Sequence, residues 1–248
     1  MTAIAPSRVP LYARHAVASD RGRWSVERDV AWDGVQADLA LTQPQVLAQL
    51  RDAVLIESFH PVNLARLMRA CWDDVDAGVC LSLEAYEGFK HFDVLRRYLD
   101  AVGYEPRITD EELVDIRRGS EQLEITPDAV IEALVEFMLS EHLAAYFFRR
   151  LSEQAAEPVL AGVLRRIAAD EVRHAQSASD LIAKRIESDP SVIPAVLDAA
   201  VGFRHYGTEV VSDIPVAMHG DAVAIRTFAS RIERLCGVRL VEHMKAGL

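Results

Sequence analysis

Apolar residues recur at spacings of three and four along most of this chain, which is typical of helices that bury one face. Leu47, Leu50 and Val54 begin the pattern shortly after Pro44. Helical patterns then follow one another over residues 44–60, 64–76, 79–102, 127–154, 157–188, 193–205 and 222–245. We expect Pro61 to bend or interrupt the first segment, because proline removes a helical hydrogen bond. No strand-like alternation of any length competes, so the sequence predicts an all-α bundle.

The chain before these patterns has a different character. Residues 1–40 lack the helical pattern, and we expect an irregular N-terminal arm in which Trp24 and Trp32 anchor the chain onto the bundle. Residues 41–248 are expected to form a single helical domain, since a chain of 248 residues is long enough to bury one large core.

Composition and charge argue against several classes of protein. A formal net charge of −11 disfavours nucleic acid as a partner, because binding to phosphates requires a basic face. The three cysteines (Cys71, Cys80 and Cys236) lack zinc-site spacing and favour reduced thiols. No apolar run approaches the length that spans a membrane, and the first 20 residues do not resemble a signal peptide. We therefore expect a cytoplasmic protein without a membrane partner.

The strongest chemical signal is a carboxylate and an imidazole three residues apart, Glu171 and His174. On a helix this spacing places both side chains on one face, where the pair can hold a transition metal in an apolar bundle. One such pair arises often by chance. A second acid, Glu141, lies 30 residues upstream inside another long helical pattern, so the two helices together have the sequence of a half-site.

The earlier helices repeat this arrangement. Glu57 precedes His91 by 34 residues, and Glu141 precedes His174 by 33. Four helices that each turn a Glu or a Glu/His pair inward form the di-iron carboxylate arrangement. Carboxylates and imidazoles suit iron or manganese and leave coordination positions open for dioxygen. We therefore expect a cofactor of two iron ions, or a mixed manganese–iron pair, with O2 as co-substrate.

Three segments resemble the soluble acyl-carrier-protein desaturases of the ferritin-like superfamily. They are the stretch Ile167–His174 (IAADEVRH) with its helix ending at Ser188-Asp189-Pro190, the stretch Glu87–Leu99 (EGFKHFDVLRRYL), and the Glu57 helix with Pro61 four residues on. The resemblance covers roughly residues 45–205. It implies a ferritin-like four-helix bundle core with additional flanking helices. It also implies a homodimer.

The resemblance implies a residue-by-residue ligand set. The implied metal ligands are Glu57, His91, Glu141, Glu171 and His174. Asp170 is implied as the acceptor that orients one of the imidazoles, as is usual for metal-bound histidine.

The chain departs from the family at Gly88, where the pattern places a bridging glutamate. We favour Glu87 as the replacement ligand, with Glu84 one turn above Gly88 as the alternative; otherwise both are solvated surface acids. His60 precedes a proline and is interpreted as a local polar residue, though it could supply the missing ligand. Our hypothesis is that the gap over Gly88 admits a substrate or exogenous carboxylate as replacement bridge.

Apolar residues flank Glu141 at helical spacing on its inward side: Phe137, Met138, Ala145 and Phe148. Ordinary core is the favoured interpretation, and the functional one is a substrate pocket shared with Gly88. The pairs Arg149-Arg150 and Arg165-Arg166 are usual for solvated helix faces. They could instead dock an acidic carrier protein or a ferredoxin.

These features favour an O2-dependent oxidoreductase, of desaturase or hydroxylase type, that acts on an acyl or other small organic substrate, free or carrier-bound. A ferredoxin or a flavin reductase would supply electrons. N-oxygenation of an amine is an alternative, but relatives of that kind tend to carry a further histidine where this chain has Ile167. Iron storage in the ferritin manner and a non-redox helical protein with one metal or none are also compatible with the pattern.

Overall fold

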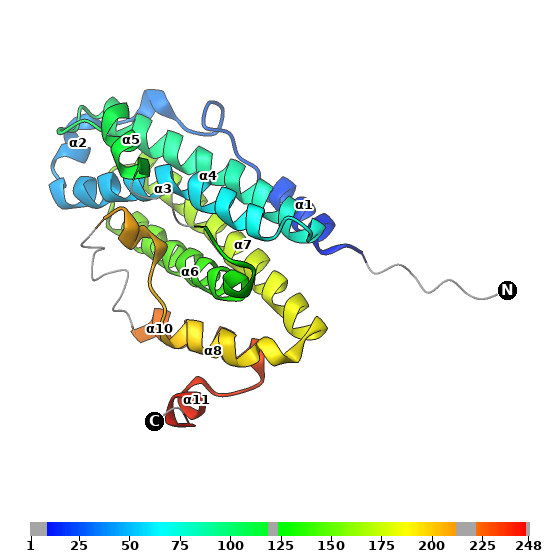
Figure 1. The fold of residues 1–248 in the computed structure, drawn as a ribbon. Coiled ribbons are helices and arrows are strands. Elements are labelled where there is room, and N and C mark those ends of the chain that lie inside the picture. The colour runs from blue at the N-terminus through cyan, green and yellow to red at the C-terminus, as the bar shows by residue number, and fades with distance from the viewer. Residues whose placement is uncertain (1–8, 119–123, 212–221, 247–248) are drawn as a thin grey trace.

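Four long helices form the core of the computed structural model, which describes residues 9–118, 124–211 and 222–246 (Figure 1). They are α3 (Pro44–Ala70), α4 (Val75–Ala101), α6 (Val130–Gln154) and α7 (Pro158–Ser188). α3 packs along α4, and α6 packs along α7. The described residues contain no strand, and the prediction of an all-α bundle is confirmed.

Shorter helices surround this core. They are α1 (Leu11–Gly22), α2 (Ala37–Leu41), α5 (Asp110–Arg118), α8 (Ile193–Val201), α10 (Ala222–Cys236) and α11 (Leu240–Ala246), with 3-10 turns at Trp32–Gly34, Pro127–Ala129, Pro190–Val192 and Tyr206–Glu209. α5 lies within the long connection between α4 and α6, and α8, α10 and α11 pack beside α6 or one another.

The core consists of two apolar layers with a polar layer between them. One layer takes the first part of α3, the last part of α4, the last part of α6 and the first part of α7. The other takes the remaining part of each helix. This order means that α3 and α7 run in one direction and α4 and α6 in the other, so a long crossover joins α4 to α6, as in ferritin-like bundles. Acidic and imidazole side chains occupy the middle.

α3 continues through Pro61, where the sequence predicted a bend or an interruption. Arg117 on α5 donates a hydrogen bond of 3.0 Å to the carbonyl oxygen of Ser58, three residues before the proline. Pro61 supplies no N–H to the carbonyl of Glu57, four residues earlier, so the bond from Arg117 does not replace the missing helical bond; it ties α5 to this stretch of α3. The unbroken helix keeps His60 inside the bundle, with only 1% of its surface exposed.

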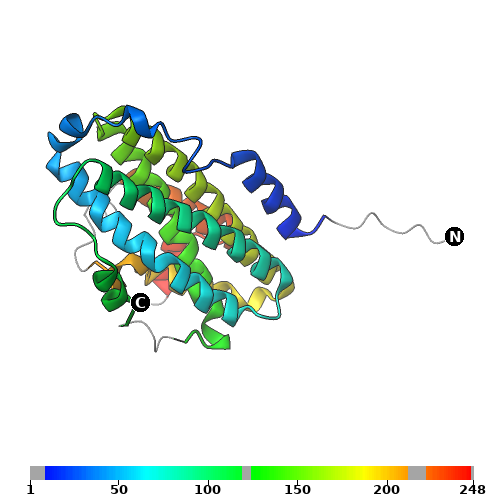
Figure 2. The same ribbon diagram turned by 90° about the horizontal axis from the view of Figure 1, so that it is seen from above.

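We expected residues 1–40 to form an irregular arm, but part of this arm is a helix. α1 is a regular helix that lies across α4 and α7 (Figure 2), although only Leu11 among its residues is buried. Trp24 is buried against the core and Trp32 packs partly against it, as predicted. The sequence did not predict α1 because its apolar periodicity is weak. Polar contacts, among them the hydrogen bond from Ser19 to Glu87, hold this helix in place.

Within the described ranges, no helix has an apolar stretch long enough to cross a bilayer. The three cysteines are free and buried.

Candidate dinuclear metal centre

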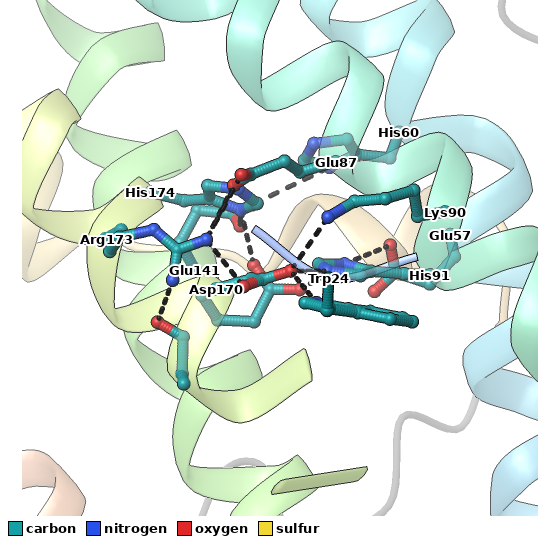
Figure 3. Close-up of polar contacts among 12 residues, drawn as sticks. Trp24, Glu57, His60, Glu87, Lys90, His91, Glu141, Asp170, Arg173 and His174 are labelled. Atoms are coloured by element: carbon teal, nitrogen blue, oxygen red, sulfur yellow. Dashed lines mark hydrogen bonds and ion pairs between the residues drawn. The ribbon is translucent and has the colours of Figure 1, made fainter. Parts of the chain in front are cut away.

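Five residues from the four core helices meet in the polar layer, and all of them except Glu171 are labelled in Figure 3. α3 contributes Glu57, α4 contributes His91, α6 contributes Glu141, and α7 contributes both Glu171 and His174. Each has 3% or less of its surface exposed. Burying ionisable groups is costly unless they are paired or bind metal, so this cluster requires compensation.

The five residues form two overlapping groups of three. One group contains Glu57, His91 and Glu171, and the other contains Glu141, Glu171 and His174, with the ligand atoms of each group within 4.8 Å of one another. Glu171 belongs to both groups. A carboxylate with two oxygens can bridge two ions, so the arrangement is that of a dinuclear centre.

The two imidazoles turn the same nitrogen inward. Nδ1 of His91 lies 2.9 Å from Glu171 Oε1 and 3.7 Å from Glu57 Oε2. Nδ1 of His174 lies 2.8 Å from Glu171 Oε2 and 3.4 Å from Glu141 Oε2. Both imidazoles are thus oriented to share an ion with carboxylates.

The outward nitrogens are held by two further carboxylates. Asp170 Oδ2 lies 3.0 Å from Nε2 of His91, and Glu87 Oε2 lies 2.9 Å from Nε2 of His174. Nη2 of Arg173 is 3.1 Å from both Glu87 oxygens and also donates to Asp170, so one guanidinium joins the two acids (Figure 3). Carboxylates in this position fix the orientation of an imidazole that binds metal.

The structure therefore gives Glu87 a different position from the predicted one. We expected a metal ligand, but the Glu87 carboxylate lies in neither group of three and instead faces the outer nitrogen of His174. Although residue 87 shares a helix face with His91, its carboxylate lies at the side of α4 that α1 and α7 cover, where Ser19 and Arg173 donate to it.

Glu84, the alternative ligand, also lies outside both groups. It is buried beside a small cavity of about 20 Å³ lined also by Glu87, His174 and Ser177. Burial raises the pKa of Glu84 to about 8. The uncharged form of this carboxyl group is therefore favoured at neutral pH.

The environment separates the pKa values of the outer and the inner acids. Burial opposes the charge on Glu87, but the hydrogen bond and charge of His174 and the hydrogen bond from Ser19 together outweigh it and lower the pKa of Glu87 to about 2. Burial opposes the charge on Asp170 as well, and the hydrogen bond and charge of His91 still hold the pKa of Asp170 well below its usual range. Both outer carboxylates are therefore ionised acceptors.

The inner acids crowd one another. Burial raises the pKa of Glu57 and of Glu141, because the charged forms lose hydration. Burial also opposes the charge on Glu171, yet the positive charge of His91, followed by that of His174, lowers the pKa of Glu171. The positive charge beside these carboxylates comes from His91 and His174: burial opposes it, but Glu171 and the neighbouring carboxylates raise the pKa of both imidazoles. A pair of metal cations would replace this charge.

His60 covers Gly88, the residue at which the chain departs from the family pattern. A Cβ atom added to Gly88 would lie 2.4 Å from Cδ2 and 3.0 Å from Nε2 of the His60 ring. The imidazole therefore fills the space that we expected to admit a substrate carboxylate. His60 lies inside the bundle, and burial lowers the pKa of this imidazole to about 4, which favours its neutral form.

The predicted pocket residues separate into two kinds. Phe137, Met138 and Phe148 are fully buried in the apolar layers, and the Phe137 ring lies 5.8 Å from that of His60. Ala145 faces instead a surface groove between α6 and α7 that Arg149 also lines. The favoured interpretation of these residues as ordinary core agrees with the first three positions.

Sequence reasoning missed three residues of this region. The Tyr206 hydroxyl donates to Glu141 Oε1 at 3.1 Å and lies 3.0 Å from Nδ1 of His60. Lys90 Nζ lies 3.5 Å from Asp170 and over the ring of Trp24. Arg173 was visible within the strongest motif, three residues after Asp170, whereas no local pattern marks Tyr206.

The residues present fit a pair of metal ions. Among the described residues, the buried atoms without a hydrogen-bond partner include His60 Nε2, His91 Nδ1 and Glu141 Oε2 in the cluster and both carboxylate oxygens of Glu84 beside it. Unpaired buried donors and acceptors are rare and call for an explanation such as a bound ion. Carboxylate oxygens with imidazole nitrogens are ligands that iron and manganese accept.

Comparisons with known proteins agree on the architecture. No protein-family model matches the chain. Three solved structures of R2-like ligand-binding oxidases resemble it, with TM-scores of 0.62, 0.58 and 0.54 at 16%, 19% and 17% identity. Each comparison covers more than nine-tenths of both chains. The fold is ferritin-like. Those neighbours are variants in which a glycine is replaced by leucine or phenylalanine, and they are described with Mn/Fe, Mn/Mn and Fe/Fe cofactors.

A short match connects the chain to the desaturases. Over 52 residues it is 44% identical to DesA2, a provisionally assigned acyl-acyl-carrier-protein desaturase from two strains of Mycobacterium tuberculosis. The match spans 21% of this chain and 19% of that relative's length. The resemblance to a soluble desaturase thus has a local counterpart in sequence, and the ferritin-like fold predicted from it is confirmed.

Proposed function

We propose that this protein is an O2-dependent oxidase with a di-iron or mixed manganese–iron centre, which oxidises an acyl or other small organic substrate. The observation that carries the proposal is the position of Glu171. This one buried carboxylate completes both groups of three and lies within 2.9 Å of Nδ1 of His91 and of His174.

In this proposal Glu57, His91, Glu141, Glu171 and His174 hold the two ions. A reduced ion pair would supply the electrons that activate dioxygen for oxidation of the substrate. Asp170 and Glu87 keep each imidazole turned with Nδ1 inward, since each accepts from the outer Nε2. The apolar layers above and below exclude water from the polar layer, which protects reactive species from side reactions.

The substrate class and partners rest on weaker support. The local match to a desaturase favours an acyl substrate, carried or free. A groove between α6 and α7 of about 420 Å³ is lined by two arginines, one acid (Glu153), a serine and four apolar residues. Arg165 and Arg149, the latter 3.5 Å from Glu153, would be the residues that meet an acidic carrier. Electrons would come from a ferredoxin or a flavin reductase. We further propose a homodimer, as the family resemblance implies, and a cytoplasmic location.

Anaerobic loading with ferrous ion tests the proposal. We expect two irons per chain, and after air and reductant are added, oxygen uptake with a new near-ultraviolet absorption. Glu171→Gln keeps the size of the side chain and should bind neither ion tightly. Glu84→Gln is the matched control, because it removes a buried acid outside both groups and should retain two irons. One iron or none in the wild-type protein would contradict the proposal.

A further inference from the structure

His60 occupies the place of the missing carboxylate. Its ring lies where the side chain of residue 88 would begin, with Nε2 3.0 Å from a Cβ atom added to Gly88. The ring centroid is 6.3 Å from that of His174, and Nδ1 is 3.7 Å from Glu141 Oε1. His60 therefore borders the group formed by Glu141, Glu171 and His174.

The hydrogen bonds around His60 fix its tautomer. The Tyr206 hydroxyl has a single hydrogen, which it donates to Glu141 Oε1 at 3.1 Å. The hydroxyl oxygen is then left to accept from Nδ1 of His60 at 3.0 Å. With its proton on Nδ1, the neutral imidazole carries a bare lone pair on Nε2.

That lone pair has no partner among the described residues, although His60 is only 1% exposed. A buried acceptor without a donor is costly, unless a ligand or an ion satisfies it. Metal-bound histidines donate their other ring N–H to a neighbouring acceptor. Tyr206 serves His60 in this way, as Asp170 serves His91 and Glu87 serves His174.

We propose that His60 Nε2 is a metal ligand on the Glu141–His174 side, in place of the carboxylate that the family pattern puts at residue 88. This inference rests on the dinuclear centre proposed above. The ion pair then has three imidazole and three carboxylate ligands: His60, His91, His174, Glu57, Glu141 and Glu171. Because imidazole is neutral, the centre carries one more positive charge than a four-carboxylate site would.

The glycine at residue 88 is explained by the same replacement of a carboxylate ligand by His60. No side chain with a Cβ atom fits at residue 88 while His60 keeps its position, since the added atom would lie 2.4 Å from the imidazole ring. A glycine inside a helix is destabilising relative to alanine. The close approach of the imidazole gives a reason for that cost.

Manganese(II) alone is the probe, which separates binding from turnover. Titration followed by X-ray absorption spectroscopy gives two affinities and the number of imidazoles bound to the ion pair. We expect three imidazoles in the wild-type protein and two in His60→Phe, where an aromatic ring of similar size lacks the nitrogen. His60→Phe should also weaken one affinity at least tenfold and leave the other unchanged.

Two variants complete the design. His205→Phe is the matched control, because His205 is equally buried and stacks on Tyr206 with ring centroids 5.0 Å apart; it should retain three imidazoles. Gly88→Glu alone should weaken manganese binding through its collision with His60. The double variant His60→Ala/Gly88→Glu should bind two ions with two imidazoles.

The outcomes separate the two proposals. Two manganese ions and only two imidazoles in the wild-type protein would overturn the role of His60 and leave the dinuclear centre standing. A wild-type protein that binds no manganese or iron would overturn both. The wild-type imidazole count decides the question even if His60→Phe does not fold.

Discussion

The two helix pairs contribute differently to the centre, although their Glu-to-His spacings are almost equal. The α6–α7 pair supplies all three members of one group, which are Glu141, Glu171 and His174. The α3–α4 pair supplies two members of the other group, Glu57 and His91, and the third member is again Glu171 of α7. The outer carboxylates are exchanged: Asp170 of α7 holds His91 of α4, and Glu87 of α4 holds His174 of α7. The halves are therefore interdependent rather than two copies of one unit.

This exchange shows what a repeated motif does and does not fix. The repeat places one Glu and one His from each half in the same layer, because helix spacing determines the face from which a side chain leaves. The partner of each outer nitrogen depends on how the helix pairs pack. Carboxylates of the opposite pair reach these nitrogens, and Arg173 joins them.

Replacing Glu57 or Glu141, one at a time, should have the largest effect on metal binding and should show which helix pair holds which ion. We expect Glu57→Ala to lose the ion of the His91 group and Glu141→Ala the ion of the His174 group, each weakened more than about 100-fold, since a lost ligand costs more than a lost outer partner. Iron per chain after desalting should fall from two to one in both variants. Loss of both ions from either variant would mean that the two groups do not bind separately.

Glu84 has no counterpart in the other half, and its titration should show this asymmetry. Its pKa is raised from 4.5 to about 8, so the folded state holds a proton that the unfolded state releases. The free energy of unfolding should therefore fall as pH rises through this interval. Glu84→Gln should remove that fall. The difference in the free energy of unfolding between the variant and the wild type should therefore be larger at pH 8 than at pH 5, by on the order of a few kcal/mol in favour of the variant.

Urea unfolding of both proteins at the two pH values, with a chelator present, measures the difference. A Glu84→Gln variant whose stability changes with pH as the wild type does would show that Glu84 titrates normally.

The exchanged carboxylates offer the finest test of interdependence. Asp170→Asn should weaken the ion held by His91, and Glu87→Gln the ion held by His174, by about 10- to 100-fold each. Each substitution thus acts on the group supplied mainly by the opposite helix pair. Manganese titration of the two variants resolves the affinities, with Asp93→Asn, which changes a partly exposed acid of α4, as control. Equal weakening of both ions by each variant would indicate coupling through Arg173 instead.

Much of the fold was predictable, because the apolar periodicity of the four core helices is strong and long. The patterns over 127–154 and 157–188 agree with α6 and α7 nearly to the residue. α1 was not predictable from periodicity, since polar contacts rather than an apolar face hold it. The continuity of α3 through Pro61 was not predictable from the local pattern, because a proline inside a helix usually bends or ends it.

The centre was predictable where one helix face decides the position. Spacing, together with the resemblance to the desaturases, singled out Glu57, His91, Glu141, Glu171 and His174, and the structure places all five in one buried layer. Glu87 was assigned to the metals because it shares a face with His91, but spacing does not reveal a second helix with an arginine. His60 and Tyr206 needed the three-dimensional path of α3 and of the chain after α8.

The unequal division of donors has a consequence for maturation of the proposed centre. The hairpin of α6 and α7 brings together Glu141, Glu171 and His174, so these three ligands can meet an ion before His60 of α3 joins them. The other group exists only after the α3–α4 hairpin docks, because Glu57 and His91 need Glu171. Ion capture at that group therefore stabilises the docked state by mass action. Cells starved of the metal would contain more of the open, protease-sensitive chain.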